Sequence, residues 1–262
     1  FVNNADLGGA FASTASTLWL QDSKAGPISG VSAASNWNIQ NCDLVSLSLK
    51  TASSKNGYVV GNTISKSVTL QGDDHTLLNN DIGGSVHFSK HGHEYVGNTI
   101  AGAVTGVALS GGGSGDNLVL TNNTIGSGLN GKGGEGWKLV GNTILSGGIV
   151  GQSGATLSSN HIVGSVTGGV YTSNIVGNTI VGNVSNIFAG CNFYDNRIEG
   201  AVTMHADATR FIRNIILGNV VGNGTGWEPV VLKSNLITGS VYVKNRAVIV
   251  HNTVYADNSK DY

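Results

Sequence analysis

Charged side chains are scarce in this sequence. Asp, Glu, Lys and Arg make up 11% of its 262 residues, and the formal net charge at pH 7 is −1. The lysines and arginines are scattered singly, so there is no basic stripe for nucleic acid and no polybasic signal for a membrane surface. No apolar run approaches the roughly 20 residues that a membrane-spanning helix needs. We therefore expect neither a nucleic-acid partner nor a membrane span.

Several motifs of cofactor-dependent and nucleophilic enzymes are also missing. The sequence has no glycine-rich phosphate loop after a strand, no Cys-x-x-Cys and no Gly-x-Ser-x-Gly. We expect no cofactor. Proline is nearly absent, with 2 residues against 40 glycines. Combined with persistent apolar columns, this composition is typical of stacked short strands and bends, not of disorder.

One short phrase recurs along the chain: an apolar residue, two spacers, usually asparagine, one more residue, then Ile, Leu or Val. Six of the eleven spacings between successive asparagine slots are 18 residues. A fixed period of this size predicts a solenoid, in which each repeat forms one coil stacked on the last. The slots are Cys42, Asn62, Asn80, Asn98, Asn123, Asn142, Asn160, Asn178, Asn196, Asn214, Asn235 and Asn252.

Two apolar columns flank the slot. One lies two residues after it and is Ile, Leu or Val throughout, as in Leu44, Ile64 and Ile82. The other lies three residues before it, as in Ile39 and Val59. The residue directly before the slot is often Gly, Asn or Asp, which tolerate a left-handed backbone and indicate a tight bend. Glycine recurs four residues after the slot and indicates a second bend, so each coil is predicted to have three short strands and three bends.

Core-facing asparagines need hydrogen-bond partners, because an unbonded buried polar group is costly. Stacked one per coil, each side-chain amide can donate to one neighbour and accept from the other. The repeat therefore predicts an asparagine ladder that fixes the register of the coils, and a structural role for each ladder residue.

The chain resembles the right-handed parallel β-helix proteins, the group of pectate-lyase-like enzymes and phage tailspikes. The phrases that carry the likeness are Val60-Gly61-Asn62-Thr63-Ile64, Val96-Gly97-Asn98-Thr99-Ile100 and their equivalents. The resemblance implies an all-β, right-handed parallel β-helix of about 12 coils over residues 36–256. Residues 1–35 lack the repeat and are expected to form an N-terminal capping or connecting segment. Residues 257–262 are expected to be a C-terminal tail of a chain that continues or is covered by another subunit.

The two cysteines occupy distant coils. Cys42 stands in the first predicted coil and Cys191 in the ninth. Eight coils correspond to a separation on the order of 38 Å at the spacing of parallel strands, whereas bridged Cα atoms lie within about 7 Å. The two thiols cannot pair within one chain, and we expect both to be free in the core.

Titratable residues gather at the third bend of neighbouring coils. Gly72-Asp73-Asp74-His75 occupies this bend in one coil and His91-Gly92-His93-Glu94 in the next, followed by an insertion that ends at Asp116. Asp73 and His91 are 18 residues apart, as are His75 and His93, so each pair is predicted to stack at about 5 Å.

Four interpretations of this bend remain open: a solvated polar surface, a carbohydrate-cleaving site, a metal site and simple glycan binding. For cleavage, Asp73, Asp74 and Glu94 are the candidate carboxylates, because glycosidases use two carboxyl groups about 5 to 9 Å apart. The histidines are candidate proton carriers or ligands, since a His can also abstract a sugar proton in a lyase. They are His75, His91 and His93. No metal-ligand spacing is diagnostic.

The functional hypothesis rests on the resemblance. It implies an extracellular or virion-surface protein, similar to a phage tailspike, that binds and possibly cleaves a surface polysaccharide, as a hydrolase or a lyase. Tailspike relatives are commonly trimers, so the resemblance also implies a homo-oligomer. The alternative is a non-enzymatic structural or adhesive solenoid, a stalk or filament subunit whose open ends stack.

Overall fold

The protein is an all-β solenoid. The computed structural model describes residues 1–13, 17–30, 36–49, 55–106, 116–131, 134–151, 153–205, 208–223, 228–244 and 246–255, and these form strands and bends without a helix. The chain divides into two compact units, Phe1–Gly134 and Glu135–Tyr262. Apart from the first and last described coils, each coil places one strand in each of three parallel sheets, which we call sheets A, B and C. The predicted three strands per coil are confirmed.

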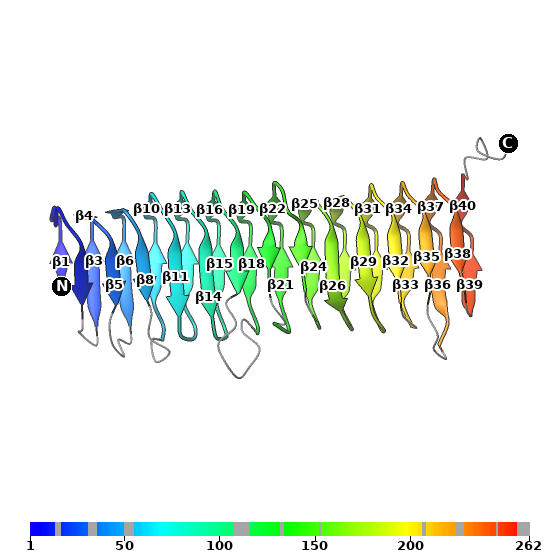
Figure 1. Cartoon of the computed structure of the whole chain (residues 1–262), viewed down its shortest axis with the longest axis horizontal. Coiled ribbons are helices and arrows are strands. Elements are labelled where there is room, and N and C mark those ends of the chain that lie inside the picture. Colours follow the sequence, from blue (N-terminus) through cyan, green and yellow to red (C-terminus); the bar gives the residue numbers. More distant parts are fainter. Residues whose placement is uncertain are drawn as a thin grey trace. The chain divides into compact units, whose positions relative to one another are not determined.

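The strands of the first unit follow one another in each sheet with a step of one coil (Figure 1). Sheet A contains β1 (Val2–Asn3), β3 (Leu18–Gln21), β6 (Trp37–Gln40), β9 (Tyr58–Val60), β12 (Thr76–Leu78), β15 (Glu94–Val96) and β18 (Val119–Thr121). Sheet B contains β4 (Lys24–Ala25), β7 (Asp43–Leu44), β10 (Thr63–Ile64), β13 (Asp81–Ile82), β16 (Thr99–Ile100) and β19 (Thr124–Ile125). Sheet C contains β2 (Phe11–Ser13), β5 (Ile28–Gly30), β8 (Leu47–Leu49), β11 (Val68–Gln71), β14 (Val86–Ser89), β17 (Val104–Gly106) and β20 (Leu129–Asn130).

The second unit repeats this order. Its sheet A contains β21 (Lys138–Val140), β24 (Thr156–Ser158), β27 (Asn174–Val176), β30 (Asn192–Tyr194), β33 (Arg210–Ile212), β36 (Val230–Lys233) and β39 (Ala247–Val250). Its sheet B contains β22 (Thr143–Ile144), β25 (His161–Val163), β28 (Thr179–Val181), β31 (Arg197–Ile198), β34 (Ile215–Ile216), β37 (Leu236–Ile237) and β40 (Thr253–Val254). Its sheet C contains β23 (Ile149–Val150), β26 (Val166–Val170), β29 (Val184–Ile187), β32 (Val202–Met204), β35 (Val220–Gly222) and β38 (Val241–Val243).

The predicted columns stack in register. Ile64 pairs with Ile82, and Ile82 with Ile100, in parallel along sheet B. Side chains alternate between the two faces of a strand, so Ile64, Ile82 and Ile100 point inward and are fully buried, whereas their neighbours in the sequence face outward. The fold is a parallel β-solenoid of about 12 coils, as predicted; its right-handed winding stays a prediction.

The asparagine ladder is present in both units. In the first unit the side-chain nitrogen of Asn62 donates to Oδ1 of Asn80 at 3.0 Å, and the series continues through Asn98 to Asn123. The same nitrogen of Asn80 also donates to the carbonyl of Val59 in the preceding coil. Each buried amide thus bonds to the coil before it and the coil after it, which removes the cost of burying it. In the second unit the ladder runs through Asn142, Asn160, Asn178, Asn196, Asn214, Asn235 and Asn252.

The bend before the slot is left-handed, as predicted. Asn41, Asn79 and Asn122 have φ values of 51°, 52° and 54°, and Gly61 and Gly97 have φ values of 65° and 63°. Glycine and asparagine adopt this conformation at low cost, which explains their preference at this position.

Coil pairing extends upstream of residue 36. Leu18 pairs with Trp37 in sheet A, and Ile28 pairs with Leu47 in sheet C. In this coil Ser23 occupies the slot, buried, and its Oγ accepts from Ala5 N and donates to the carbonyl of Gln21. The expectation that residues 1–35 lack the repeat therefore needs correction for the described residues. The repeat was not recognised here because the slot holds Ser23 instead of an asparagine. A capping role for residues 1–35 stays a prediction.

The remaining sequence expectations concern the thiols and the tail. Cys42 and Cys191 are free and buried, as predicted. Residues 256–262, which include the expected tail, lie outside the described residues. The prediction of a single β-helix domain over residues 36–256 stays a prediction.

Candidate functional site

Two of the three candidate histidines lie inside the solenoid. His75 and His93 each stand five residues before an asparagine slot, at an inward position that Trp37 and Leu118 occupy in other coils. Both rings are almost fully buried, and they stack with centroids 5.5 Å apart and planes inclined by 18°. The predicted stacking of this pair is confirmed, but the pair lies in the core, where a polymer cannot reach it.

Burial holds both rings neutral. Nδ1 of His75 accepts the N–H of Gly57 at 3.0 Å, so it carries no proton of its own. Nε2 of His93 donates to the carbonyl of Ser89 at 3.0 Å. Burial, together with repulsion from the neighbouring His93, lowers the pKa of His75 to about 4. Burial likewise lowers the pKa of His93.

His91 is the accessible histidine of the three, and it lies in an exposed ionic cluster. Its Nδ1 is 3.2 Å from Oδ2 of Asp116, and its backbone N–H donates to Oδ1 of Asp73 at 3.3 Å. Lys55 lies 3.9 Å from the other oxygen of Asp73. The predicted stacking of Asp73 with His91 is confirmed. Exposed charged contacts of this kind add little stability. The Asp116 carboxylate can, however, orient the imidazole ring of His91, and a general base must be oriented in this way.

The remaining candidates are Asp74, which follows Asp73 in the sequence, and Glu94, which lies three residues after His91. Asp74 has a left-handed backbone (φ 59°), and its side chain packs against Gly92, where any Cβ would collide with it. Glu94 begins β15 and faces outward, paired with Thr76 and Val119. Among the described residues, no group of three or more His, Cys, Asp or Glu is arranged to hold a metal ion.

Glu94 belongs to a column of outward side chains that the sequence argument missed. Along sheet A of the first unit, parallel pairing aligns Trp19 with Asn38, Asn38 with Tyr58, Tyr58 with Thr76, and Thr76 with Glu94. We call these five residues the outer column. Trp19 and Tyr58 are 50% and 51% exposed. Strand alternation gives the signal: the residue four before each slot is flanked by two buried positions and must face solvent.

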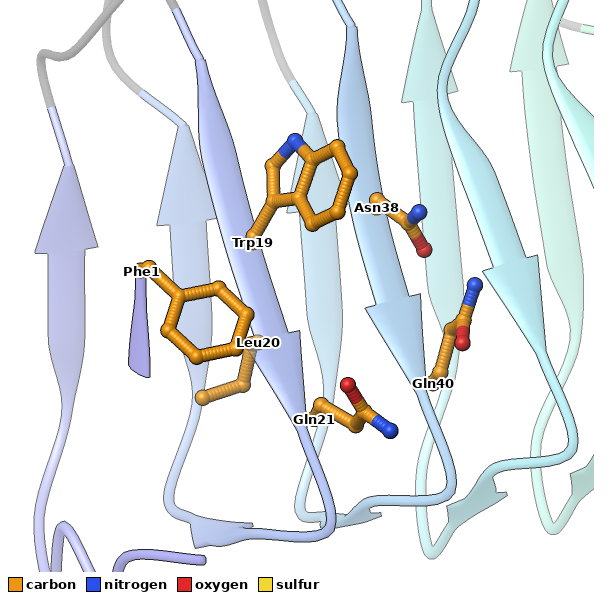
Figure 2. Close-up of a pocket in the computed structure, with 6 residues that line it drawn as sticks. All are labelled: Phe1, Trp19, Leu20, Gln21, Asn38 and Gln40. Carbon is orange, nitrogen blue, oxygen red and sulfur yellow. The ribbon is translucent and has the colours of Figure 1, made fainter. Parts of the chain in front are cut away.

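The first coils of this face carry a small pocket of about 50 Å³. Figure 2 shows the rings of Phe1 and Trp19 side by side, with the amides of Gln21, Asn38 and Gln40 next to them. The ring centroids of Phe1 and Trp19 are 6.3 Å apart, inclined by 54°. Leu20 completes the lining, which contains no charged side chain. The arrangement offers an apolar platform bordered by groups that both donate and accept hydrogen bonds.

A wider hollow of about 530 Å³ lies over sheet B of the same unit. Its lining includes Asp6, Lys24 and Asp43, which follow one another along the sheet with alternating charge. It contains no aromatic side chain, and is therefore less suited than the Trp19 pocket to hold a sugar ring.

Comparison with models of protein families, with curated proteins and with solved structures found no match. No helix among the described residues is long and apolar enough to cross a membrane. The fold itself is consistent with a carbohydrate-binding or a structural solenoid.

Proposed function

We propose that the protein is an extracellular or virion-surface, carbohydrate-directed solenoid that binds a polysaccharide along the outer column of sheet A. The observation that carries the proposal is the in-register alignment of Trp19, Asn38, Tyr58, Thr76 and Glu94. The tailspike-like assembly that the resemblance implies, with a homotrimer, belongs to this proposal.

The spacing of the outer column suits an extended polymer. Adjacent strands lie about 4.8 Å apart, so the exposed rings of Trp19 and Tyr58 are separated by two coils, or roughly 10 Å. A polymer lying along the column meets two rings, Trp19 and Tyr58, with Asn38 between them and polar side chains beyond Tyr58. The aromatic faces cover the apolar C–H faces of sugar rings, and the amide and hydroxyl groups bond to their hydroxyls.

Tyr58→Ala is expected to weaken polysaccharide binding by about tenfold, because removing an exposed aromatic platform forfeits on the order of 1.4 kcal/mol of contact. Affinity electrophoresis against a panel of neutral and acidic bacterial polysaccharides measures this loss. Tyr171→Ala is the matched control, since Tyr171 is 45% exposed but belongs to the second unit. Equal retardation of Tyr58→Ala and the unaltered protein on every bound polymer would contradict the proposal.

Cleavage is the finer part of the proposal. A polymer on the outer column passes Glu94, which follows the bend that carries Asp73, Asp74 and His91. In hydrolysis, one carboxylic acid would protonate the glycosidic oxygen while a carboxylate attacks the sugar or activates water. In a lyase, His91 oriented by Asp116 would instead abstract a sugar proton. The burial of His75 and His93 leaves His91 as the histidine that such a reaction can use.

We expect a bound polysaccharide to lose viscosity on incubation with the protein, and Asp74→Ala and Glu94→Ala each to abolish this loss. Asp81→Ala removes an exposed carboxylate from sheet B and is the control. Viscosity that falls equally with both variants would exclude these carboxylates. A polymer that stays intact under the unaltered protein would restrict the function to binding.

A structural role is the second candidate, and the last described coil favours it. Ile249 is 53% exposed and Val254 is 44% exposed, although they occupy columns that are buried in the preceding coils. Apolar side chains and strand edges at this coil can pair with a further coil or with another chain. End-to-end assembly visible by electron microscopy, combined with no binding in the polysaccharide panel, would favour this role.

A further inference from the structure

We propose that the pocket of Phe1, Trp19, Gln21, Asn38 and Gln40 is a subsite for one uncharged pyranose ring. This inference rests on the proposed glycan binding and adds to it the chemical class of the sugar at this position. The sugar lies with its C–H face on Trp19, its edge against Phe1, and its hydroxyls on the three amides.

The aromatic part of the pocket has the shape that a sugar ring needs. Trp19 is 50% exposed, and its neighbours Leu18 and Leu20 are buried, so the alternation of the strand places the indole on the outer face of sheet A. Phe1 is 79% exposed and tilted toward it by 54°. Figure 2 shows the two rings forming one wall of the pocket. Apolar surface left open in this way is favourable to cover.

The polar part of the pocket consists of three neutral amides, one of which has an oxygen without a hydrogen-bond partner among the described residues. Gln21 and Gln40 pair directly along sheet A, so their amides are one coil apart. The side-chain oxygen of Asn38 is buried and has no hydrogen-bond partner among the described residues. A buried polar atom without a hydrogen-bond partner costs free energy. A ligand hydroxyl that donates to the Asn38 amide oxygen would therefore be stabilising. Each amide both donates and accepts, which matches hydroxyl groups that do the same.

The charge around the pocket selects against acidic sugars. No lysine, arginine or histidine lines it. The residue after Gln21 is Asp22, which is exposed, adopts a left-handed backbone and accepts a hydrogen bond from Asn41 at 3.2 Å. A uronate or sulfated sugar would lose part of its hydration beside these neutral side chains, in a coil that also carries the Asp22 carboxylate.

The pocket volume of about 50 Å³ limits the contact to part of one ring. Drug-sized ligands occupy pockets of roughly 300 to 1,000 Å³, so a single sugar is expected to bind weakly, with a Kd on the order of 1 mM. Tighter binding requires an oligosaccharide long enough to reach Tyr58.

The test compares pairs of small sugars that differ only in charge. Methyl glucoside and methyl galactoside are measured against the corresponding methyl glucuronide and methyl galacturonide, by saturation-transfer NMR with the full chain. We expect the neutral member of at least one pair to bind with millimolar Kd and its acidic counterpart to bind at least about tenfold more weakly. Trp19→Ala and the double variant Gln21→Ala, Gln40→Ala should each weaken neutral-sugar binding about tenfold. Trp19→Phe should retain most of it.

Several results would overturn the inference. Equal binding of both members of every pair, or binding unchanged in Trp19→Ala, excludes a neutral subsite at this pocket. If Tyr58→Ala weakens polysaccharide binding while Trp19→Ala does not, the subsite is wrong and the proposed function stands. If no sugar and no polysaccharide binds, both fail. Because Trp19 is exposed, Trp19→Ala should keep the unfolding midpoint of the unaltered protein. If Trp19→Ala lowers that midpoint, sugar binding by the double variant Gln21→Ala, Gln40→Ala tests the subsite instead.

Discussion

Asn178→Ala is expected to lower the free energy of unfolding by about 3 to 5 kcal/mol, a loss expected when buried hydrogen-bonding groups are orphaned. Asn178 stands in the middle of the ladder of the second unit and is almost fully buried. Its Oδ1 accepts both the backbone N–H and the side-chain nitrogen of Asn160, each at 2.9 Å. Urea unfolding followed by far-UV circular dichroism measures the loss.

The size of this effect follows from the groups that the substitution leaves behind. Without Oδ1, the backbone N–H of Asn160 and one of its side-chain hydrogens lose their acceptor in the interior. The carbonyl of Leu157 and Oδ1 of Asn196 each lose a donor. Each buried unsatisfied group costs roughly 1 to 3 kcal/mol.

Asn174→Ala is the matched control. Asn174 has the same chemistry, lies four residues upstream in the same coil, and faces outward from β27, where its Oδ1 accepts from Asn192 at 3.1 Å. Its removal is expected to change the free energy of unfolding by less than about 1 kcal/mol. If Asn178→Ala costs no more than Asn174→Ala, the ladder does not stabilise the stack.

Acidification from pH 6.5 to pH 4 is expected to destabilise the protein through the buried histidine pair, by on the order of 3 kcal/mol for His75 alone. The pKa of His75 is lowered to about 4 by burial and by His93, against 6.5 for an exposed histidine. Between these two pH values the unfolded chain binds a proton that the folded chain does not, so stability falls as the pH falls. Below about pH 4 this contribution is fully lost.

The hydrogen bonds explain why the folded protein resists this proton. Protonation of His75 at Nδ1 would place a second N–H against the N–H of Gly57, which donates to that atom. It would also place a cation beside the stacked ring of His93. Asp73 acts in the opposite direction on both rings, but burial dominates.

Urea midpoints measured at steps between pH 7 and pH 4 test this expectation. His93→Leu should flatten the pH dependence, because it removes one of the two buried imidazoles; leucine fits, since Leu118 occupies the same inward position one coil later. His161→Thr, which alters an exposed histidine on β25, is the control. If the urea midpoint of His93→Leu depends on pH as steeply as that of the unaltered protein, the histidine pair does not cause the acid destabilisation.

Much of the fold was predictable because the residues that repeat with the period are the ones that must be buried. The columns through Ile64 and Val59, and the ladder through Asn62, follow from the alternation of side chains and from the cost of unpaired amides. The upstream coil was missed because Ser23 replaces the amide in the slot, although Leu20, three residues before it, keeps the apolar column. A search for the columns alone finds it.

The candidate site was less predictable, because a shift of one residue along a strand decides whether a side chain points into the core or toward solvent. His93 and Glu94 are neighbours in sequence, yet one is inside and the other outside. The number of residues before the slot decides the direction of the side chain. His75 and Trp37 stand five residues before it and are buried, whereas Glu94 and Trp19 stand four residues before it and face outward. The contact between Nδ1 of His91 and Oδ2 of Asp116 joins residues 25 positions apart, so the 18-residue period does not predict it. Catalysis by Asp73, Asp74 and Glu94 stays a prediction.

The uniform ladder makes the number of coils adjustable. In the second unit the side-chain nitrogens of Asn160, Asn178 and Asn196 each donate to the next ladder asparagine, 18 residues on, at 2.9 to 3.0 Å. A segment running from one slot to the next therefore begins and ends at interchangeable points of the backbone. Duplication or loss of such a segment joins matching ends, so proteins of this type can lengthen or shorten by whole coils without redesign of the interior.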